Sequence, residues 1–438
     1  MNVKKDTKEK QNIIVKKELV DELKEDDEDI DLIKIDLQGL VSMMNEEGIK
    51  RYDLTDYAID EIIQDFIQRG SSLNSFFLMD IGQIIRRYKL WKKMLPSIEI
   101  FYAVKCNPDK ILLKTLSLLG LGFDVASKAE ISMVDELEVS KDLIIFANPV
   151  KEIDHIMYSR SRGIGLMTFD NEDELKKISV FHPNANLIIR ILVDDSKSKL
   201  PFGSKFGCPI SNIDNVFTLA KQLKMNIIGV SFHVGSNCID PISYSDAIIR
   251  SKEVFKIAEN YGFKFYLLDI GGGYSGIENN DNDEHFHKTA LMINEAIHLN
   301  FNDIPNLRVI AEPGRFFATS IGTLACNIIG KKQIKAENDQ KVFHYYINSN
   351  LYGMFNNIIF DKADIKLNLL NKYPNEEFES VIFGQTCDSM DKIIDSMKLP
   401  ELACGDWLYF TNHGAYTLAS ASTFNGFFLA DVKYIFTF

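Results

Sequence analysis

Eight β-rich apolar runs recur between residues 101 and 315, and this recurrence constrains the fold more than any other feature. Helical patterns lie between most of them, for example at residues 110–119, 129–137, 214–223, 244–261 and 288–298. Strands that alternate with helices form parallel βα units, and eight such units predict a closed (β/α)8 barrel of the TIM type. The runs are residues 101–105, 122–127, 143–148, 166–170, 187–191, 227–235, 266–273 and 308–315.

A doubly wound open sheet is the alternative topology for such an alternation. The number of units favours the barrel, and no glycine-rich dinucleotide fingerprint opens the first unit. An irregular stretch at residues 194–207 precedes the sixth run.

The segments outside the barrel have a different character. Residues 1–30 are mostly charged and polar, which predicts a disordered tail. After residue 320, short strand-like runs follow one another without helices of comparable length, which predicts a mainly antiparallel β-sheet domain. We therefore expect a barrel at residues 81–320 and a sheet domain at 321–438, which the segment 31–80 joins through a strand at 76–80.

Charge and cysteine usage exclude several classes of function. The net charge of −13 over 438 residues argues against nucleic acid or an anionic membrane as a partner. No apolar run is long enough to span a bilayer, and the first residues lack the apolar core of a signal peptide. The six cysteines show no metal-binding or disulfide-framework spacing, so we expect reduced thiols, a cytoplasmic location and no metal site.

The ends of the predicted strands carry polar residues or glycines, and the C-terminal ends of barrel strands are where barrel enzymes place their chemistry. Each residue alone has a structural explanation, such as a helix cap, an ion pair, a core histidine or a turn. Because buried charges are costly unless paired, the whole set predicts one connected site. Its members are Lys105, Asp124, Asn148, Asp170, Arg190, His233, Gly271, Gly272, Gly273, Glu312 and Arg315.

The chemistry of this set is that of pyridoxal 5'-phosphate. Lysine forms a Schiff base with an aldehyde, and the bare backbone of Gly271–Gly273 can approach a phosphate that Arg315 also contacts. A carboxylate such as Glu312 can hold a pyridine nitrogen protonated, and an imidazole such as His233 can stack on the ring. A protonated pyridine acts as an electron sink for a carbanion at the substrate α-carbon.

Longer motifs make the chain resemble the eukaryotic ornithine decarboxylases, which belong to the alanine-racemase-like, fold-type III enzymes that use pyridoxal phosphate. The resemblance covers residues from about 75 to about 430. It rests on YAVKCN at 102–107, GFDVASKAE at 122–130, VSFHVGS at 230–236, LDIGGG at 268–273, AEPGR at 311–315, GDW at 405–407, GAY at 414–416 and ASTFNG at 421–426.

The resemblance implies a role for each matching residue. Lys105 would hold the cofactor, His233 would stack on its ring and Glu312 would pair with its nitrogen. The implied phosphate ligands are Ser236, Gly273, Arg315 and Tyr416, and Asp124, Glu130 and Arg190 would order the ring face.

A second group would complete the site from another subunit. Cys387 would govern protonation of the carbanion, Asp388 would hold the distal ammonium of the substrate, and Phe424 would lie near the site wall. Because Lys105 and Cys387 would come from different chains, the resemblance implies a homodimer with shared active sites.

One departure concerns the substrate. Where the family carries an aspartate after the strand at residues 345–348, this chain has Ser349, and Gln385 and Ser389 replace a proline and a glycine nearby. Loss of a second carboxylate would weaken a site for a diamino acid, so Ser349 is a candidate substrate-binding residue. The predicted reaction is conversion of L-ornithine to putrescine and CO2. The alternatives are a lysine or arginine decarboxylase, or an inactive homologue that binds the regulatory protein antizyme.

Overall fold

In the computed structural model of the chain, the described residues are 16–17, 19–20, 35–70, 73–277, 280–335 and 340–438. The predicted charged tail at residues 1–30 lies outside them except for residues 16, 17, 19 and 20. Two compact units are present. One is formed mainly by Arg87–Phe317, and the other by Val41–Arg86 together with Ala318–Phe438.

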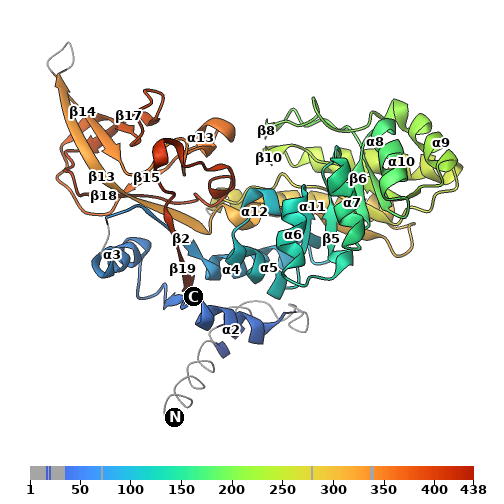
Figure 1. Cartoon of the computed structure of the whole chain (residues 1–438), viewed down its shortest axis with the longest axis horizontal. Coiled ribbons are helices and arrows are strands. Elements are labelled where there is room, and N and C mark those ends of the chain that lie inside the picture. The colour runs from blue at the N-terminus through green and yellow to red at the C-terminus, as the bar shows by residue number, and fades with distance from the viewer. Residues whose placement is uncertain (1–15, 18, 21–34, 71–72, 278–279, 336–339) are drawn as a thin grey trace, which may run out of the picture. The chain divides into compact units, whose positions relative to one another are not determined.

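The first unit contains the closed eight-stranded parallel barrel, as predicted (Figure 1). Each strand pairs in parallel with its neighbours, and β12 returns to β3 to close the ring. In order around the barrel, the strands are β3 (Glu99–Ala103), β4 (Gly122–Val125), β5 (Ile144–Phe146), β6 (Leu166–Phe169), β7 (Asn186–Arg190), β9 (Asn226–Ser231), β11 (Leu267–Asp269) and β12 (Arg308–Ala311).

Helices follow these strands, and short polar side chains start several of them. Asp109 accepts hydrogen bonds from the amides of Ile111 and Leu112 at the start of α5, and Asn171 accepts one from Glu174 at the start of α8. Such N-caps end the strand-to-helix loops at defined residues. The helices of this unit are α5 (Lys110–Leu118), α6 (Lys128–Asp135), α7 (Ile153–Ser161), α8 (Glu172–Phe181), α9 (Ile213–Gln222), α10 (Ile242–Asn260), α11 (Asn280–Phe301) and α12 (Arg315–Ala318).

Apolar side chains fill the inside of the barrel. One buried cluster takes a residue from each of seven strands: Phe101, Ile145, Leu166, Ile188, Ile228, Leu267 and Ile310. A barrel packed in this way leaves only its ends for chemistry.

The second unit is built on a mainly antiparallel sheet with the order β1-β19-β2-β13-β14-β16-β17, in which β18 and β15 branch from β13. β13 is the central strand, because it pairs antiparallel with β2, β14 and β18. The strands are β1 (Lys50–Tyr52), β2 (Phe76–Asp80), β13 (Gly322–Lys335), β14 (Lys341–Ile347), β15 (Leu367–Leu369), β16 (Glu377–Phe383), β17 (Lys392–Pro400), β18 (Trp407–Phe410) and β19 (Asp431–Thr437).

Three helices belong with these strands in sequence: α2 (Leu37–Glu46), α3 (Ile59–Arg69) and α13 (Asn357–Phe360). The helix α4 (Ile81–Met94) follows β2 and leads into the barrel. Within the sheet unit, β2 pairs in parallel with β19, so a strand that precedes the barrel in sequence and one that follows it are neighbours in one sheet.

The stretch at residues 194–207 is more ordered than its sequence indicates. It contains β8 (Ser198–Leu200), which pairs antiparallel with β10 (Ser236–Cys238). Three residues in each strand are too few to give a periodic signal in the sequence. In the described parts of the chain, no helix has the length and apolar character needed to cross a membrane.

Candidate active site at the carboxyl end of the barrel

Lys105 lies just beyond a barrel strand rather than inside it. The strand β3 stops at Ala103, and a 3-10 turn, Val104–Cys106, carries the lysine. Its ammonium forms an ion pair with the carboxylate of Asp124 on the neighbouring strand β4. Asp124 is 1% exposed, whereas the side chain of Lys105 is 44% exposed, so the amine is accessible while a buried carboxylate fixes its position.

Two further carboxyls lie at this end of the barrel: Asp269, the last residue of β11, is fully buried, and Glu312, directly after β12, is partly buried. Burial raises the pKa of Glu312 well above its usual range, and the charge of Asp269 raises it further. Burial likewise raises the pKa of Asp269 to about 7. The pair therefore holds a proton at neutral pH, which is the property required of a group that shares a proton with a ring nitrogen.

Arg190, the last residue of β7, is the cation that faces these acids. Burial lowers its guanidinium pKa, and the nearby charges of Glu312, Asp170 and Asp269 oppose that shift. The guanidinium also lies 5.0 Å from the ring centroid of Phe206. Charges from several strand ends therefore interact in one electrostatic cluster.

His233 lies two residues beyond β9 and is held by its own turn. Its Nδ1 accepts a hydrogen bond of 3.0 Å from the amide of Gly235, and its ring meets Phe202 edge-on at 5.0 Å. Burial lowers its pKa well below the usual value, and Arg190 and Lys105 act in the same direction. His233 is therefore a neutral, flat imidazole, which suits stacking on an aromatic ring.

The three glycines after β11 form a cradle that no other residue could form. A Cβ at Gly271 would lie 2.2 Å from the carbonyl oxygen of Phe232, and one at Gly272 would lie 2.7 Å from that of Glu312. Gly271 and Gly273 also adopt φ values of +63° and +109°, which side chains disfavour.

The hydrogen bonds of this turn leave donors for an anion. The three glycine carbonyls accept from Glu312 N, Tyr244 Oη and Cys238 N at 2.8, 3.0 and 2.9 Å. Gly271 N donates to Asp269 Oδ1 at 2.9 Å. Among the described residues, no acceptor faces the amides of Gly272 and Gly273. Successive backbone amides without acceptors form an anion site of the nest type.

Arg315 and Ser236 are two further candidate phosphate ligands. Arg315 Nε donates to Ser236 Oγ at 2.9 Å, and Ser236 is 7% exposed. Arg315 opens the short helix α12, which directly follows the turn that carries Glu312. The arrangement fits pyridoxal phosphate: an aldehyde partner, a neutral face for the ring, a proton for its nitrogen and a phosphate cradle.

Three further candidates, Asp170, Asn148 and Glu130, also hold the backbone of nearby loops. Asp170 accepts hydrogen bonds from Asn171 Nδ2 and the amide of Gly207, and Asn148 accepts one from the amide of Val150. Glu130 accepts a hydrogen bond of 2.6 Å from the amide of Ala126, and burial raises the pKa of Glu130.

The sheet unit carries the remaining candidates, and Asp388 and Cys387 lie together on its loop between β16 and β17. Asp388 accepts hydrogen bonds from the amide of Met390 and the hydroxyl of Tyr352, which lower its pKa. The phenol ring of Tyr352 stacks on Phe424 at 4.2 Å. Cys387 is exposed, and its backbone amide donates a hydrogen bond of 3.1 Å to the side-chain oxygen of Asn425, which helps to fix its position.

Of the two remaining candidates, Ser349 is buried and Tyr416 has an uncommon backbone conformation. Ser349 is 4% exposed, and its hydroxyl hydrogen bonds to the buried thiol of Cys326. Tyr416 follows Gly414 and adopts a φ of +55°, which is uncommon for a residue with a side chain. A Cβ at Gly414 would lie 1.8 Å from the carbonyl oxygen of Ala318, so the glycine is required for this turn.

Three buried acidic residues were not among the residues predicted from the sequence. Asp269 directly precedes the glycine cradle, and its position at a strand end was the available signal. Asp361 and Asp391 are buried in the sheet unit at 7% and 1% exposure. Their burial could not be read from the sequence because both occupy irregular segments.

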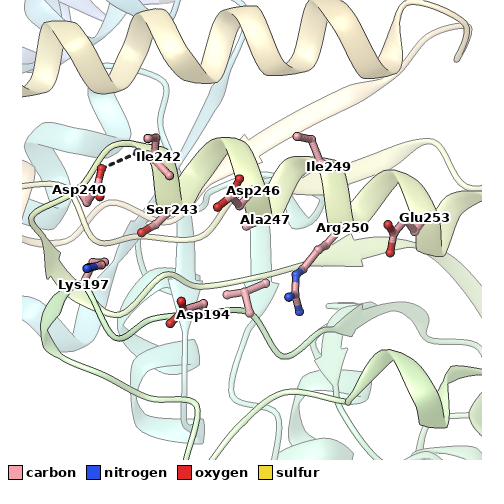
Figure 2. Close-up of a pocket in the computed structure, with 11 residues that line it drawn as sticks. Asp194, Lys197, Asp240, Ile242, Ser243, Asp246, Ala247, Ile249, Arg250 and Glu253 are labelled. Carbon is pink, nitrogen blue, oxygen red and sulfur yellow. Dashed lines mark hydrogen bonds between the residues drawn. The ribbon is translucent and has the colours of Figure 1, made fainter.

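A surface groove of about 390 Å3 lies beside α10, between this helix and the loop that follows β7 (Figure 2). Figure 2 shows the carboxylates of Asp194, Asp246 and Glu253 and the guanidinium of Arg250 along it. None of the predicted site residues lines this groove.

A parallel barrel with an accessible lysine, a buried proton-holding acid and a phosphate cradle at its carboxyl end defines a class: barrel enzymes that use pyridoxal phosphate. The sequence agrees with that class. The family described as pyridoxal-dependent decarboxylase, pyridoxal binding domain, matches residues 81–319, and the chain belongs to this family. Its cofactor is pyridoxal phosphate.

Individual relatives agree with this assignment. Antizyme inhibitor 2 of Xenopus laevis is 43% identical over 399 residues, which cover 89% of this chain and 86% of that protein. Ornithine decarboxylase of Mus musculus is 40% identical over 402 residues, with the same coverage of 89% and 86%. The crystal structure of the Paramecium bursaria Chlorella virus arginine decarboxylase has a TM-score of 0.82 and 38% identity, and it covers 86% of this chain and 100% of that chain.

Proposed function

We propose that this protein decarboxylates L-ornithine to putrescine and CO2, a reaction of polyamine biosynthesis. The observation that carries the proposal is the meeting of Lys105, the proton-holding Glu312 and the glycine cradle at one end of the barrel. The bound cofactor supplies an electron sink for the α-carbanion that forms when CO2 leaves.

The barrel residues would hold the cofactor. Lys105 would bind its aldehyde, and the Asp124 carboxylate keeps the amine in place. Glu312 would supply a proton to the ring nitrogen, because burial and Asp269 raise its pKa. The amides of Gly272 and Gly273, with Arg315 and Ser236, would hold the phosphate. Asp124, Arg190 and Glu130 order the charges around the ring face, and Tyr416 of the sheet unit is the remaining proposed phosphate ligand.

The loop of the sheet unit handles the substrate. Asp388 has a lowered pKa, so it stays ionised and can accept the distal ammonium of ornithine. Cys387 is exposed and delivers the proton to the α-carbon, while Phe424 forms part of the wall. Ser349 is buried against Cys326, which supports a packing role for this residue and not contact with a substrate.

Two aspects of assembly and location belong to the same proposal. We propose a homodimer in which Lys105 of one chain and Cys387 of the other complete each site. We also propose a cytoplasmic location, which the six free cysteines support.

Borohydride reduction followed by peptide mass spectrometry tests the core of the proposal. Reduction should attach pyridoxal phosphate to the peptide that contains Lys105, and the Lys105→Arg variant should lose the adduct. CO2 release from ornithine, lysine and arginine, compared as kcat/KM, then identifies the substrate. Absence of CO2 from all three would exclude the decarboxylase.

A second function is favoured by one comparison, the similarity to an antizyme inhibitor. If the protein instead bound antizyme without catalysis, it would show no CO2 release and would form a complex with antizyme in size-exclusion chromatography. The retained Lys105, Glu312 and Cys387 support the enzyme over this alternative.

A further inference from the structure

The glycine cradle is backed by two buried tyrosines whose role goes beyond filling space. Tyr244 on α10 is 1% exposed, and Tyr274, which follows the cradle, is 4% exposed. Their rings stack at 5.0 Å with an angle of 22°, and Trp91 packs edge-on against Tyr274 at 5.0 Å. The Tyr244 ring is thus held on one side by another aromatic ring.

The two hydroxyls differ in what they contact. Tyr244 Oη donates to the carbonyl oxygen of Gly272 at 3.0 Å. Tyr274 Oη is buried and contacts no hydrogen-bond partner among the described residues. Burial raises the pKa of both phenols well above the usual value, so the Tyr244 hydroxyl remains a donor at physiological pH.

The contact with Gly272 fixes more than one carbonyl. The carbonyl of Gly272 and the amide of Gly273 belong to the same peptide unit. In a planar trans peptide, these two groups point in opposite directions. When Tyr244 holds the oxygen on the buried side, the Gly273 N–H must therefore point to the opposite side, where no described residue accepts from it.

This peptide needs such a restraint because glycine stands on both sides of it. Glycine tolerates conformations that other residues avoid, so a peptide between two glycines can rotate at little conformational cost. The carbonyls of Gly271 and Gly273 are held by backbone amides, whereas that of Gly272 is held by a side chain. Tyr244 is thus the point at which a single substitution can release the cradle.

We propose that Tyr244 is a positioning residue for the cofactor phosphate, acting through the Gly272–Gly273 peptide. The inference rests on the phosphate role proposed above for the cradle. It predicts that the Tyr244 hydroxyl contributes to binding of the phosphate and not to binding of the pyridine ring.

The test compares two ligands and two variants in equilibrium dialysis of the full-length protein. Pyridoxal phosphate and pyridoxal differ only in the phosphate, and Tyr244→Phe and Tyr274→Phe each remove one hydroxyl while keeping the ring. Tyr244→Phe should weaken binding of pyridoxal phosphate about three- to tenfold, as expected for one hydrogen bond, and leave pyridoxal unchanged. Tyr274→Phe should bind both ligands like the parent.

A rescue variant separates the hydrogen bond from the shape of the side chain. Tyr244→4-aminophenylalanine restores a donor at the same position and should restore the affinity for pyridoxal phosphate. Thermal unfolding establishes that each variant is folded. Should Tyr244→Phe not fold, 4-fluorophenylalanine, which has a similar shape and no donor, takes its place.

Several results would overturn the inference. Parent-like affinity of Tyr244→Phe for pyridoxal phosphate would do so. Equal loss of affinity for pyridoxal phosphate and pyridoxal would also do so, as would equal loss in Tyr244→Phe and Tyr274→Phe, because packing would then explain the effect. Failure of the amino variant to restore affinity would also do so. A parent that binds pyridoxal as tightly as pyridoxal phosphate would instead refute the proposed phosphate cradle itself.

Discussion

Asp269 is a carboxyl whose proton is held by its surroundings. It lies at the end of β11, is fully buried, and accepts the Gly271 amide at 2.9 Å. Glu312 is next to it in the same electrostatic cluster. A raised carboxyl pKa is also a statement about stability, because the folded chain then binds a proton that the unfolded chain releases.

The first prediction concerns the pH dependence of unfolding. In the unfolded chain, Asp269 loses its proton near pH 4, whereas in the folded protein it does so at about 7. The folded state holds more protons in this window, so the free energy of unfolding falls as the pH rises through it. Asp269→Asn keeps an acceptor for Gly271 and cannot ionise. Between pH 4.5 and 7.5, the parent should therefore lose roughly 2–4 kcal/mol more than this variant.

Urea unfolding of the cofactor-free protein at both pH values measures this difference. Asp395→Asn is the control, because Asp395 is 87% exposed and should leave the parent's pH dependence intact. An identical pH dependence in the parent and in Asp269→Asn would refute the prediction.

The second prediction concerns Ser349. Because this residue is 4% exposed beside Cys326, an aspartate in its place would bury a carboxylate. We expect Ser349→Asp to lower the free energy of unfolding by about 2–4 kcal/mol and to give no gain in kcat/KM for ornithine. Ser349→Ala, which adds no charge, is the matched control. A stable aspartate variant with a large gain for ornithine would restore Ser349 as a substrate residue.

At the scale of elements, the loop from Gly384 to Asp391 depends on one buried side chain. Asp391 accepts the amide of Leu351 at 2.8 Å, and the amide and hydroxyl of Thr386 at 2.9 and 2.7 Å. A Cβ at Gly384 would lie 2.2 Å from Asp391 Oδ1, so the backbone approaches this carboxylate closely. The loop that carries Cys387 and Asp388 is therefore organised from its own interior.

The third prediction follows from this arrangement. Asp391→Ala leaves three donors without an acceptor, so it should lower the free energy of unfolding by about 2–4 kcal/mol and speed hydrogen exchange in residues 384–391. It should also lower kcat/KM, since Cys387 and Asp388 lose their fixed position. Asp395→Ala, on the exposed face of β17, should change neither. Unchanged exchange in the loop of Asp391→Ala would show that other contacts hold it.

The elements also show where the sequence is informative. All eight barrel strands lie where apolar β-rich runs predict them, because burial on both faces imposes a strong pattern. The predicted strands are too long at their carboxyl ends: the run 266–273 is a strand only at Leu267–Asp269, and 308–315 only at Arg308–Ala311. In the first of these runs, Gly271 and Gly273 adopt positive φ values, which an extended strand does not have. The sequence therefore located the strands better than the turns that hold the candidate site.

Two strands of the sheet unit, β15 and β17, escaped prediction for related reasons. β15 has three residues, and β17 is an edge strand in which most residues are partly or fully exposed. Neither has the continuous apolar pattern from which strands are inferred. The chemistry-bearing residues of the barrel, by contrast, could be named because they follow strongly patterned strands.

At the scale of the whole molecule, the fourth prediction tests a shared site. If Lys105 and Cys387 act together from different chains, Lys105→Ala and Cys387→Ala are each inactive alone. After random exchange of subunits, half of the dimers would contain one of each, and each of these would have one intact site. The mixture should regain about a quarter of the parent activity.

Activity of the mixed variants, measured after subunit exchange, checks this expectation. The control is the double variant Lys105→Ala/Cys387→Ala mixed with the parent. If each site takes Lys105 from one chain and Cys387 from the other, such a mixed dimer has no intact site. If each chain builds its own site, the mixed dimer has one intact site. Failure of the single variants to complement would show that each chain builds its own site.

The pairing of β2 with β13 and β19 has a consequence for synthesis. Phe76–Asp80 leaves the ribosome before the barrel sequence, but its partners at Gly322–Lys335 and Asp431–Thr437 follow that sequence. During translation, the edges of this apolar strand therefore stay unpaired until the entire barrel sequence has been synthesised. The cell must therefore keep this nascent strand from pairing with wrong partners. If the barrel folds as soon as its own sequence has emerged, only this sheet is left to be completed.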